Sequence, residues 1–158
     1  MAIQVGERVP NIELQVMGSN GPEKLSTGEL FAGKKVVVFA VPGAFTPTCS
    51  AAHLPGFVVN ADQIKARGVD TIACTSVNDA FVMDAWGKAS NAEEILMLAD
   101  GLAEFATAVG LTQDRTATKM GIRSQRYAMI VDDGVVTWLE VDEKGLEKTS
   151  AEAVLAAL

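Results

Sequence analysis

Two short apolar runs, separated by a stretch with helical character, constrain the fold more than any other part of the chain. The first run, residues 36–41, is β-branched and aromatic and is bounded by turn residues, so it predicts a buried strand. Residues 69–75 predict a second strand. The chain between them favours a helix that bends near Pro55 and ends at Gly68. A strand, a helix and a strand at this spacing predict a right-handed parallel crossover.

The rest of the chain continues the alternation of strands and helices. We expect further strands or short buried runs over residues 11–16, 95–99, 127–131 and 135–141, and helices that begin near residues 26, 79, 102 and 150. The pair Asp133-Gly134 predicts a β-hairpin between the last two strands. No repeat, long linker or low-complexity segment appears, so we expect one domain over residues 1–158. The predicted class is α/β, with a central mixed β-sheet flanked by helices.

Composition narrows the range of partners. A chain of 158 residues with 49% hydrophobic residues is long and apolar enough for a sizeable core. Its formal charge of -7 disfavours binding to nucleic acid or to an anionic membrane surface, because both would repel it. The first residues show no basic region followed by an apolar core, and no apolar run approaches about 20 residues. We therefore expect a cytoplasmic protein without a targeting segment.

Cysteine chemistry depends on two residues, Cys49 and Cys74. Their separation matches neither a zinc-binding pattern nor a Cys-x-x-Cys redox pair, and Ala52 stands where the second cysteine of such a pair would be. The chain has one histidine, too few nitrogen and sulfur ligands for a metal site of the usual kind. We expect no metal and no bound cofactor, and thiol chemistry as the simplest use of these residues.

Cys49 lies at the start of the helix that follows the first strand. Pro42-Gly43 ends the strand, Thr46 is suited to the N-cap, and Pro47 to the first helical position, which leaves Cys49 at about the third. Unpaired backbone N–H groups and the helix dipole stabilise a thiolate there relative to a thiol. The residue pattern therefore predicts an ionised cysteine.

Plainer interpretations of these residues remain open from position alone. Free cysteines are often small buried apolar residues, and Cys49 fits that description as well. His53 lies four residues further on, along the same helix face, but a lone histidine more often packs in a helix than takes part in catalysis. Arg126 by itself would be an ordinary charge at a strand edge.

The spacing of Pro42, Thr46 and Cys49 resembles the Pro-x-x-x-Thr-x-x-Cys signature of peroxiredoxins, which are thiol peroxidases of the thioredoxin fold. The surrounding sequence closely resembles the type II branch of that family, over residues 42–50, 53–57 and 76–83. Arg126, in the run 124–129, matches the active-site arginine of the branch. The resemblance covers nearly the whole chain and implies a thioredoxin-like fold.

The resemblance also implies a role for each of these residues. Cys49 would attack a hydroperoxide and become a sulfenic acid, while its backbone N–H and the Thr46 hydroxyl bind the peroxide oxygens. Arg126 would stabilise the thiolate and the departing oxygen, with Arg123 as the alternative, and Pro42 would shield the sulfur. The residues expected in the substrate pocket are Gly43, Phe45, Thr48 and His53.

A sulfenic acid must be recycled by another thiol. Some type II members carry a resolving cysteine near the C-terminus, but residues 148–151 here are Lys-Thr-Ser-Ala. Cys74 is a possible resolving thiol, although its apolar strand favours a buried, inert side chain. We therefore predict an external reductant, glutathione with glutaredoxin, and thioredoxin as the second choice. The resemblance alone implies a homodimer.

Other functions on the same fold compete with this one. A thiol–disulfide oxidoreductase or a glutathione transferase would also use a cysteine at a helix start, but the missing Cys-x-x-Cys pair and the presence of Thr46 disfavour them. A redox sensor would use oxidation of the cysteine without repeated turnover. Turnover with a peroxide and a thiol distinguishes the sensor from the peroxidase.

Overall fold

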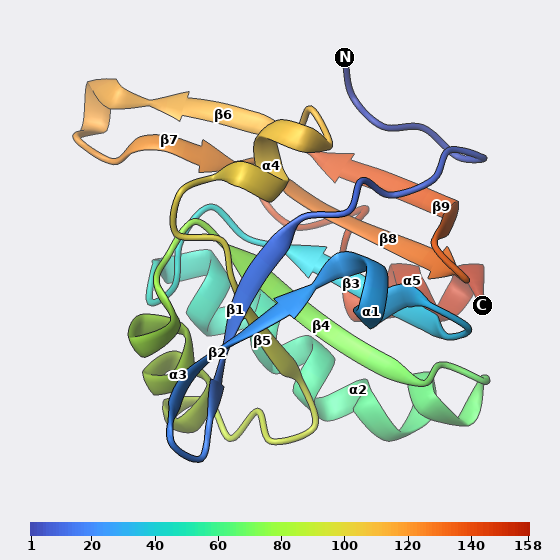
Figure 1. Cartoon of the computed structure of the whole chain (residues 1–158). Helices are drawn as coiled ribbons and strands as arrows, with labels where there is room; N and C mark the ends of the chain where they lie inside the picture. The colour runs from blue at the N-terminus through green and yellow to red at the C-terminus, as the bar shows by residue number, and fades with distance from the viewer.

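The computed structural model describes all residues, Met1–Leu158, and arranges them as a twisted central sheet with helices on both faces (Figure 1). The strand order across the main sheet is β2 (Gly21–Ser26), β1 (Glu13–Gly18), β5 (Leu96–Ala99), β4 (Thr71–Ser76), β3 (Lys35–Ala40), β8 (Arg126–Asp132) and β9 (Val135–Asp142). β3 pairs parallel with β4, and β4 pairs parallel with β5. The remaining neighbours pair antiparallel, which confirms the predicted mixed sheet and its parallel crossover.

Strand β3 is buried on both faces because its sequence is apolar without alternation. Val37 and Phe39 pack into one core, and Val36 and Val38 pack into the other. The first core lies under helices α2 (Leu54–Ala66), α3 (Ala80–Ala89) and α5 (Ala151–Ala157). The second lies under α1 (Thr27–Phe31) and α4 (Glu104–Ala108). β3 is therefore a rigid base for the residues that follow it.

The helical segment after β3 begins at Pro47, as predicted, but it is not a uniform α-helix. Residues Cys49–His53 form a π-helical turn, η1, in which the Leu54 N–H bonds to the Cys49 carbonyl. Such wide turns are rare and occur often at functional sites. The turn ends just before Pro55, which has no N–H to donate to a preceding carbonyl. The irregularity expected at Pro55 therefore takes the form of the π turn that carries Cys49.

Caps and turns explain where several other elements begin. Ser26, Asp79 and Ser150 each accept a hydrogen bond from a backbone N–H in the first turn of the helix that follows. The β8–β9 hairpin turns at Asp133 and Gly134, both in the left-handed region with φ of 47° and 84°. These capped helices and this hairpin are confirmed. No helix has both the length and the apolar character that crossing a membrane requires.

Two hairpins lie outside the expected elements. β2 adds to β1 at one edge of the main sheet. β6 (Thr112–Arg115) and β7 (Gly121–Ser124) form a separate two-stranded sheet, with a 3-10 turn, η2 (Thr116–Thr118), at the tip, and this hairpin projects beyond the main sheet (Figure 1). Neither β2 nor the β6–β7 pair buries a regular apolar face. The sequence therefore lacks the alternation that would have predicted them.

Candidate active site

Sheet pairing brings Cys49 and Arg126 together. β8 runs antiparallel to β3 with Tyr127 opposite Ala40, so Arg126 lies just beyond the end of β3, where the chain leaves the sheet toward Cys49. The Arg126 guanidinium donates from Nη2 to Cys49 Sγ over 3.1 Å, across a sequence separation of 77 residues. Cys49 is 1% exposed and Arg126 is 8% exposed. A buried cation therefore faces the sulfur directly.

Thr46 lies beside Cys49 but does not act as the predicted N-cap. Its hydroxyl donates to the Gly43 carbonyl over 2.7 Å instead of accepting from the helix. Phe45, with a left-handed φ of 63°, lets the chain turn back at this point. The turn brings the Gly43 carbonyl close to the Thr46 side chain. The Thr46 hydroxyl therefore bonds to this carbonyl and not to a backbone N–H of the helix, as an N-cap would.

A cavity of about 450 Å³ opens beside these residues. Pro42, Thr46 and Thr48 line it, together with Arg126. The other expected pocket residues do not line this cavity. Gly43 packs behind Thr46, Phe45 points outward with 54% of its surface exposed and its ring near Trp86, and His53 lies beneath the surface.

His53 supports Arg126 from inside the protein. Its Nε2 lies 2.9 Å from the Thr149 carbonyl, which only accepts, so Nε2 carries the proton. Nδ1 is then free to accept from Arg126 Nη1 over 2.6 Å. The imidazole packs against the stacked rings of Phe39 and Phe57 at a tilted angle. Burial, followed by the charge of Arg126, lowers the pKa of His53 to about 4. A neutral histidine thus orients the arginine.

Asp142 and Thr149 complete this hydrogen-bonded chain, and neither was a candidate from the sequence. Asp142 ends β9 directly opposite Arg126. Its carboxylate accepts from the N–H groups of Glu147, Lys148 and Thr149 and from the Thr149 hydroxyl. Burial acts to raise the pKa of Asp142, but these hydrogen bonds outweigh it and lower the pKa. An aspartate at a strand end before a polar loop is the one sequence signal that could have indicated this anchor.

Arg123, the alternative to Arg126, is held elsewhere. Its Nη1 donates to the Val77 carbonyl and its Nε to the Met120 carbonyl, each over 2.9 Å. These bonds fix the end of the β6–β7 hairpin against the loop after β4. Arg126 is therefore the arginine that contacts Cys49.

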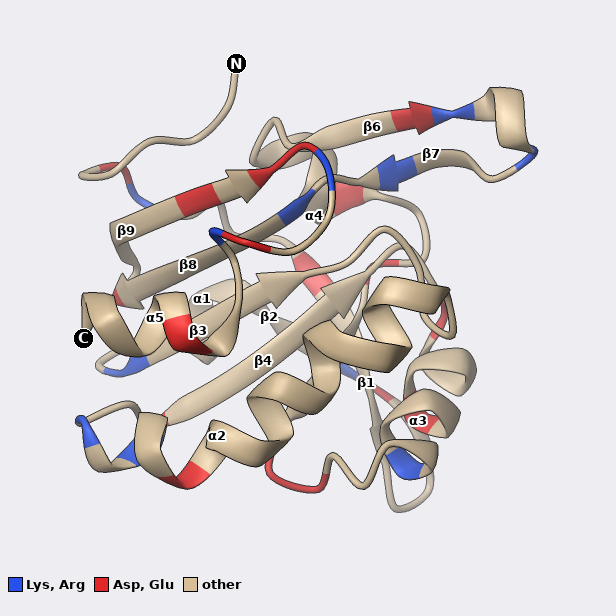
Figure 2. Cartoon of the chain, turned by 180° about the vertical axis from the view of Figure 1, so that it is seen from behind, with Lys and Arg blue, Asp and Glu red and all other residues tan.

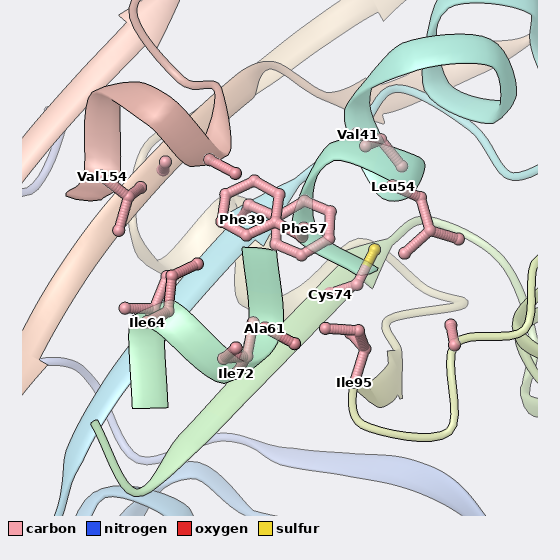
Figure 3. Packing of buried hydrophobic residues seen from close by; sticks show 14 of the residues in the cluster. Phe39, Val41, Leu54, Phe57, Ala61, Ile64, Ile72, Cys74, Ile95 and Val154 are labelled. Carbon is pink, nitrogen blue, oxygen red and sulfur yellow. The ribbon is translucent and has the colours of Figure 1, made fainter. Parts of the chain in front are cut away.

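Cys74 lies inside the apolar core. It pairs with Phe39 across β3 and β4 and is fully buried, and Figure 3 shows its sulfur among the side chains of Leu54, Phe57 and Ile95. Burial raises the pKa of the Cys74 thiol well above its ordinary value, and the nearby Cys49 acts in the same direction. Both cysteines are free.

Trp86 provides an indirect link between α3 and the cysteine turn. Its indole N–H donates to the hydroxyl of Ser50, the residue after Cys49, over 3.0 Å. Trp86 is almost completely buried. Its fluorescence is therefore suited to report changes at Cys49.

Comparisons with known proteins identify the family of the chain. The redoxin family model matches residues 4–155. Peroxiredoxin-2E, chloroplastic, of Arabidopsis thaliana is 47% identical, with 99% of this chain and 70% of that protein covered. Peroxiredoxin-2C of rice is 45% identical, with 99% and 98% covered.

A solved structure shows the same fold. The crystal structure of reduced Prx3 from Vibrio vulnificus in complex with H2O2 superposes with a TM-score of 0.95, at 62% identity and 98% coverage of both chains. The prediction of a thioredoxin-like α/β fold is therefore confirmed. With these relatives matching along its whole length, the chain belongs to the type II peroxiredoxins and is a thiol-dependent peroxidase.

Proposed function

We propose that Cys49 is the residue that reduces the hydroperoxide. Its thiolate attacks one peroxide oxygen, the O–O bond breaks, and the other oxygen leaves with a proton as water or an alcohol. Sulfur is oxidised to the sulfenic acid and the peroxide is reduced. The observation that carries this proposal is the 3.1 Å contact between Arg126 Nη2 and Cys49 Sγ.

The charges around Arg126 favour a thiolate at this position. A buried guanidinium is costly unless an anion or a set of acceptors compensates it. The ion pairs of the structure lie elsewhere, and none involves Arg126. The nearest carboxylate on the paired strand, Asp142, is occupied by the loop that follows it. The Cys49 thiolate is therefore the natural counter-ion for Arg126.

Thr46 and Pro42 shape the approach of the peroxide. The Thr46 hydroxyl lines the cavity beside Arg126 and can bond a peroxide oxygen in place of its present acceptor, the Gly43 carbonyl. The Cys49 N–H lies in the first helical turn, where backbone donors lack helical acceptors. Pro42 forms part of the cavity wall and limits access of water to the sulfur. The Thr46 hydroxyl, the Cys49 N–H and Arg126 together stabilise charge on the departing oxygen.

The reductant in this proposal is an external thiol, glutathione with glutaredoxin, and thioredoxin is the alternative. Cys74 is fully buried among apolar side chains, and it is the second and last cysteine of the chain. An incoming thiol therefore reaches the sulfenic acid of Cys49 more easily than Cys74 does. No bound cofactor or metal is needed, because the peroxide supplies the oxidising equivalents and the thiol the reducing ones.

The test of the peroxide step is the rate at which one equivalent of hydrogen peroxide consumes the Cys49 thiol. The control is Cys49→Ser, and free cysteine at the same pH is the reference. We expect loss far faster than for free cysteine, and no such loss in the control. A rate equal to that of free cysteine would refute the assignment of Cys49.

The test of the reductant is steady-state peroxide consumption with each reducing system in turn. Glutathione with glutaredoxin is expected to support turnover at the highest rate, and thioredoxin with its reductase at a lower one. Higher turnover with thioredoxin would reverse the order proposed here.

The proposal also includes a homodimer in a reducing compartment, the cytoplasm. Phe45 and Phe81 are 54% and 66% exposed near the cysteine turn and α3, where apolar surface is available for a second copy. The two free cysteines are consistent with a reducing compartment. Sedimentation of the wild type and of Phe81→Glu would test the dimer, which the charge should weaken.

A further inference from the structure

Basic residues form the outer rim of the cavity whose floor contains Arg126. Arg115 ends β6 and lines the cavity from the projecting β6–β7 hairpin. Lys144 lines it from the loop after β9. Figure 2 shows basic positions on β6, on β7, at the start of β8 and in the loop after β9. Three basic residues, Arg115, Arg126 and Lys144, therefore line this cavity in a chain whose formal charge is -7.

The rim charges have no carboxylate partner within the protein. Arg115 bonds only through Nε, to Gln113 Oε1 over 3.2 Å, so both terminal nitrogens of its guanidinium have no protein acceptor. Lys144 makes neither a side-chain hydrogen bond nor an ion pair. The three ion pairs of the structure join Lys24 to Glu13, Lys65 to Glu94 and Lys88 to Asp84. Each of them lies away from this cavity.

Two acidic residues also line the cavity, and only one has a free carboxylate. Asp142 is occupied by the backbone of residues 147–149. Glu143 is exposed and makes no ion pair with Lys144. Hydrogen bonds do not remove the charge of Asp142, so three cations, Arg126, Arg115 and Lys144, face two carboxylates across the cavity. The cavity keeps a small excess of positive charge, and the terminal nitrogens of Arg115 and the Lys144 amine are the donors left free for an anion.

The chemistry of a free guanidinium defines what this rim can bind. Arginine presents two parallel N–H donors that match a carboxylate, and lysine adds a mobile point charge. The cavity of about 450 Å³ has the size of a small-molecule site. Cys49 itself does not line the cavity, but Arg126 does and contacts its sulfur, so a ligand that reaches the sulfur beside Arg126 could hold a carboxylate at Arg115.

We propose that Arg115 and Lys144 form a carboxylate-binding subsite for the small molecule that reacts at Cys49. This inference rests on the proposed function of Cys49. The carboxylate belongs to a small thiol of the glutathione class or to a hydroperoxide that carries an acid group. Hydrogen peroxide carries no carboxylate, so the subsite has no effect on its reaction.

The reduction of the sulfenic acid balances without another reactant. The sulfur of the thiol bonds to Cys49 Sγ, the S–O bond breaks, and the hydroxide leaves with the thiol proton as water. A mixed disulfide forms, in which the incoming thiol is oxidised and the Cys49 sulfur is reduced. A second thiol then releases Cys49 as the thiol and forms the free disulfide.

The first arm of the test follows reduction of preformed Cys49 sulfenic acid by stopped-flow tryptophan fluorescence. The probes are glutathione, its diethyl ester and dithiothreitol, of which only glutathione carries carboxylates. Arg115→Gln and Lys144→Gln are each expected to slow reduction by glutathione about fivefold, as for one exposed ion pair of about 1 kcal/mol. Neither variant should slow dithiothreitol, which is neutral, or the diethyl ester, which keeps only the ammonium charge.

Two matched variants control for net charge. Arg8→Gln changes the same charge at the far end of β9, where Arg8 bridges to Val135, and is expected to have no effect. Glu143→Gln removes the carboxylate of the cavity that makes no hydrogen bond. It is expected to increase the rate at which glutathione reduces the sulfenic acid about twofold. If Glu143→Gln increased the rate of reduction by glutathione and Lys144→Gln decreased it, the charges at this cavity, and not the net charge of the protein, would control the rate.

The second arm measures loss of the Cys49 thiol with linoleic acid hydroperoxide, its methyl ester and hydrogen peroxide. If Arg115→Gln slows only the acid, the carboxylate belongs to the hydroperoxide; if it slows only glutathione in the first arm, it belongs to the thiol. Equal rates for Arg115→Gln and wild type with every charged probe would overturn the subsite. Hydrogen peroxide tests the proposed function and not the subsite. If the wild type lost its Cys49 thiol to hydrogen peroxide no faster than free cysteine does, the role of Cys49 itself would be refuted.

Discussion

The two cysteines share burial but differ in what surrounds them. Cys49 is 1% exposed and Cys74 is fully buried, and both are free thiols. The Cys49 sulfur accepts from Arg126, whereas Cys74 lies among hydrocarbon side chains (Figure 3). The two buried sulfurs therefore differ in whether a charged partner lies beside them, and we expect that difference to decide which of them reacts.

The difference follows from the position of each residue relative to the sheet. Cys74 lies within β4 and pairs with Phe39 of β3, so backbone and side chains enclose it on every side. Cys49 follows the end of β3, where the neighbouring β8 begins with Arg126. In open α/β sheets, binding sites lie beyond the carboxyl ends of the parallel strands, and this one does too.

The largest expected effect is the loss of peroxide consumption when Cys49, but not Cys74, is replaced. Cys49→Ser should reduce peroxide consumption to the background rate, because a hydroxyl does not provide the thiolate nucleophile. The measurement is peroxide consumption with excess thiol, and Cys74→Ser is the matched control. Turnover that survives in Cys49→Ser would place the reactive thiol at Cys74 and reverse the comparison.

Removing the cation should make Cys49 behave more like Cys74. Arg126→Gln is expected to slow the peroxide step by about 10²- to 10³-fold, the usual cost of losing one donor to developing charge. Arg126→Lys keeps the charge but not the two-nitrogen geometry that bonds His53 and Cys49 together, so it should recover only part of the rate. The rate of Cys49 thiol loss with hydrogen peroxide in each variant measures this; a wild-type rate in Arg126→Gln would contradict the electrostatic role.

Acid should destabilise the folded protein through His53, which lies behind Arg126 and Cys49. The pKa of His53 is about 4 in the folded protein and about 6.5 when unfolded, so the unfolded chain binds the proton first as the pH falls. The free energy of unfolding should fall by about 3 kcal/mol between pH 6.5 and pH 4, from a shift of about 2.5 units at 1.36 kcal/mol each. Denaturant unfolding at several pH values measures it. His53→Asn should lose this part of the dependence, and an equal slope in that variant would refute the assignment.

The Thr46 hydroxyl is expected to matter less than Arg126 and only at the Cys49 end. Thr46→Val keeps the shape but removes the hydroxyl, and it should slow peroxide reduction about tenfold to 10²-fold. Thr46→Ser keeps the donor and should stay near the wild-type rate. If both variants reduced peroxide at the wild-type rate, Thr46 would have no part in the mechanism.

The smallest expected effect concerns Cys74. Cys74→Ala removes one buried sulfur, which should lower the free energy of unfolding by about 1 kcal/mol, as for the loss of one buried methylene-sized group. The rate of Cys49 thiol loss with hydrogen peroxide should not change. Lost turnover with a normal first step would instead make Cys74 the resolving thiol.

Local sequence patterns predicted the central part of the fold. The apolar run of β3, the caps at Ser26, Asp79 and Ser150, and the turn at Asp133-Gly134 all depend on neighbours within a few residues. The β6–β7 hairpin was missed because its strands are largely polar and lack the apolar alternation that predicts a strand. Its position sets Arg115 at the rim of the cavity.

The site itself was predictable only in part. Cys49, Thr46 and Arg126 carry a recognisable motif, and Pro42 and Thr48 line the cavity as expected. The chain of hydrogen bonds behind Arg126 had no sequence signature, because it joins residues from different elements. Asp142 and Thr149 lie close to Arg126 only through the β8–β9 pairing and the loop that follows.

The sequence by itself determined the strand–turn–helix that presents Cys49, since strand propensity, Pro42-Gly43 and Pro47 act locally. Tertiary structure alone decided which of two buried cysteines faces a cation. The pairing of β3 with β8 places Arg126 on the Cys49 sulfur, across a sequence separation of 77 residues, and the neutral His53 holds it there. Such an electrostatic contact depends on distances in three dimensions, which a one-dimensional pattern does not contain.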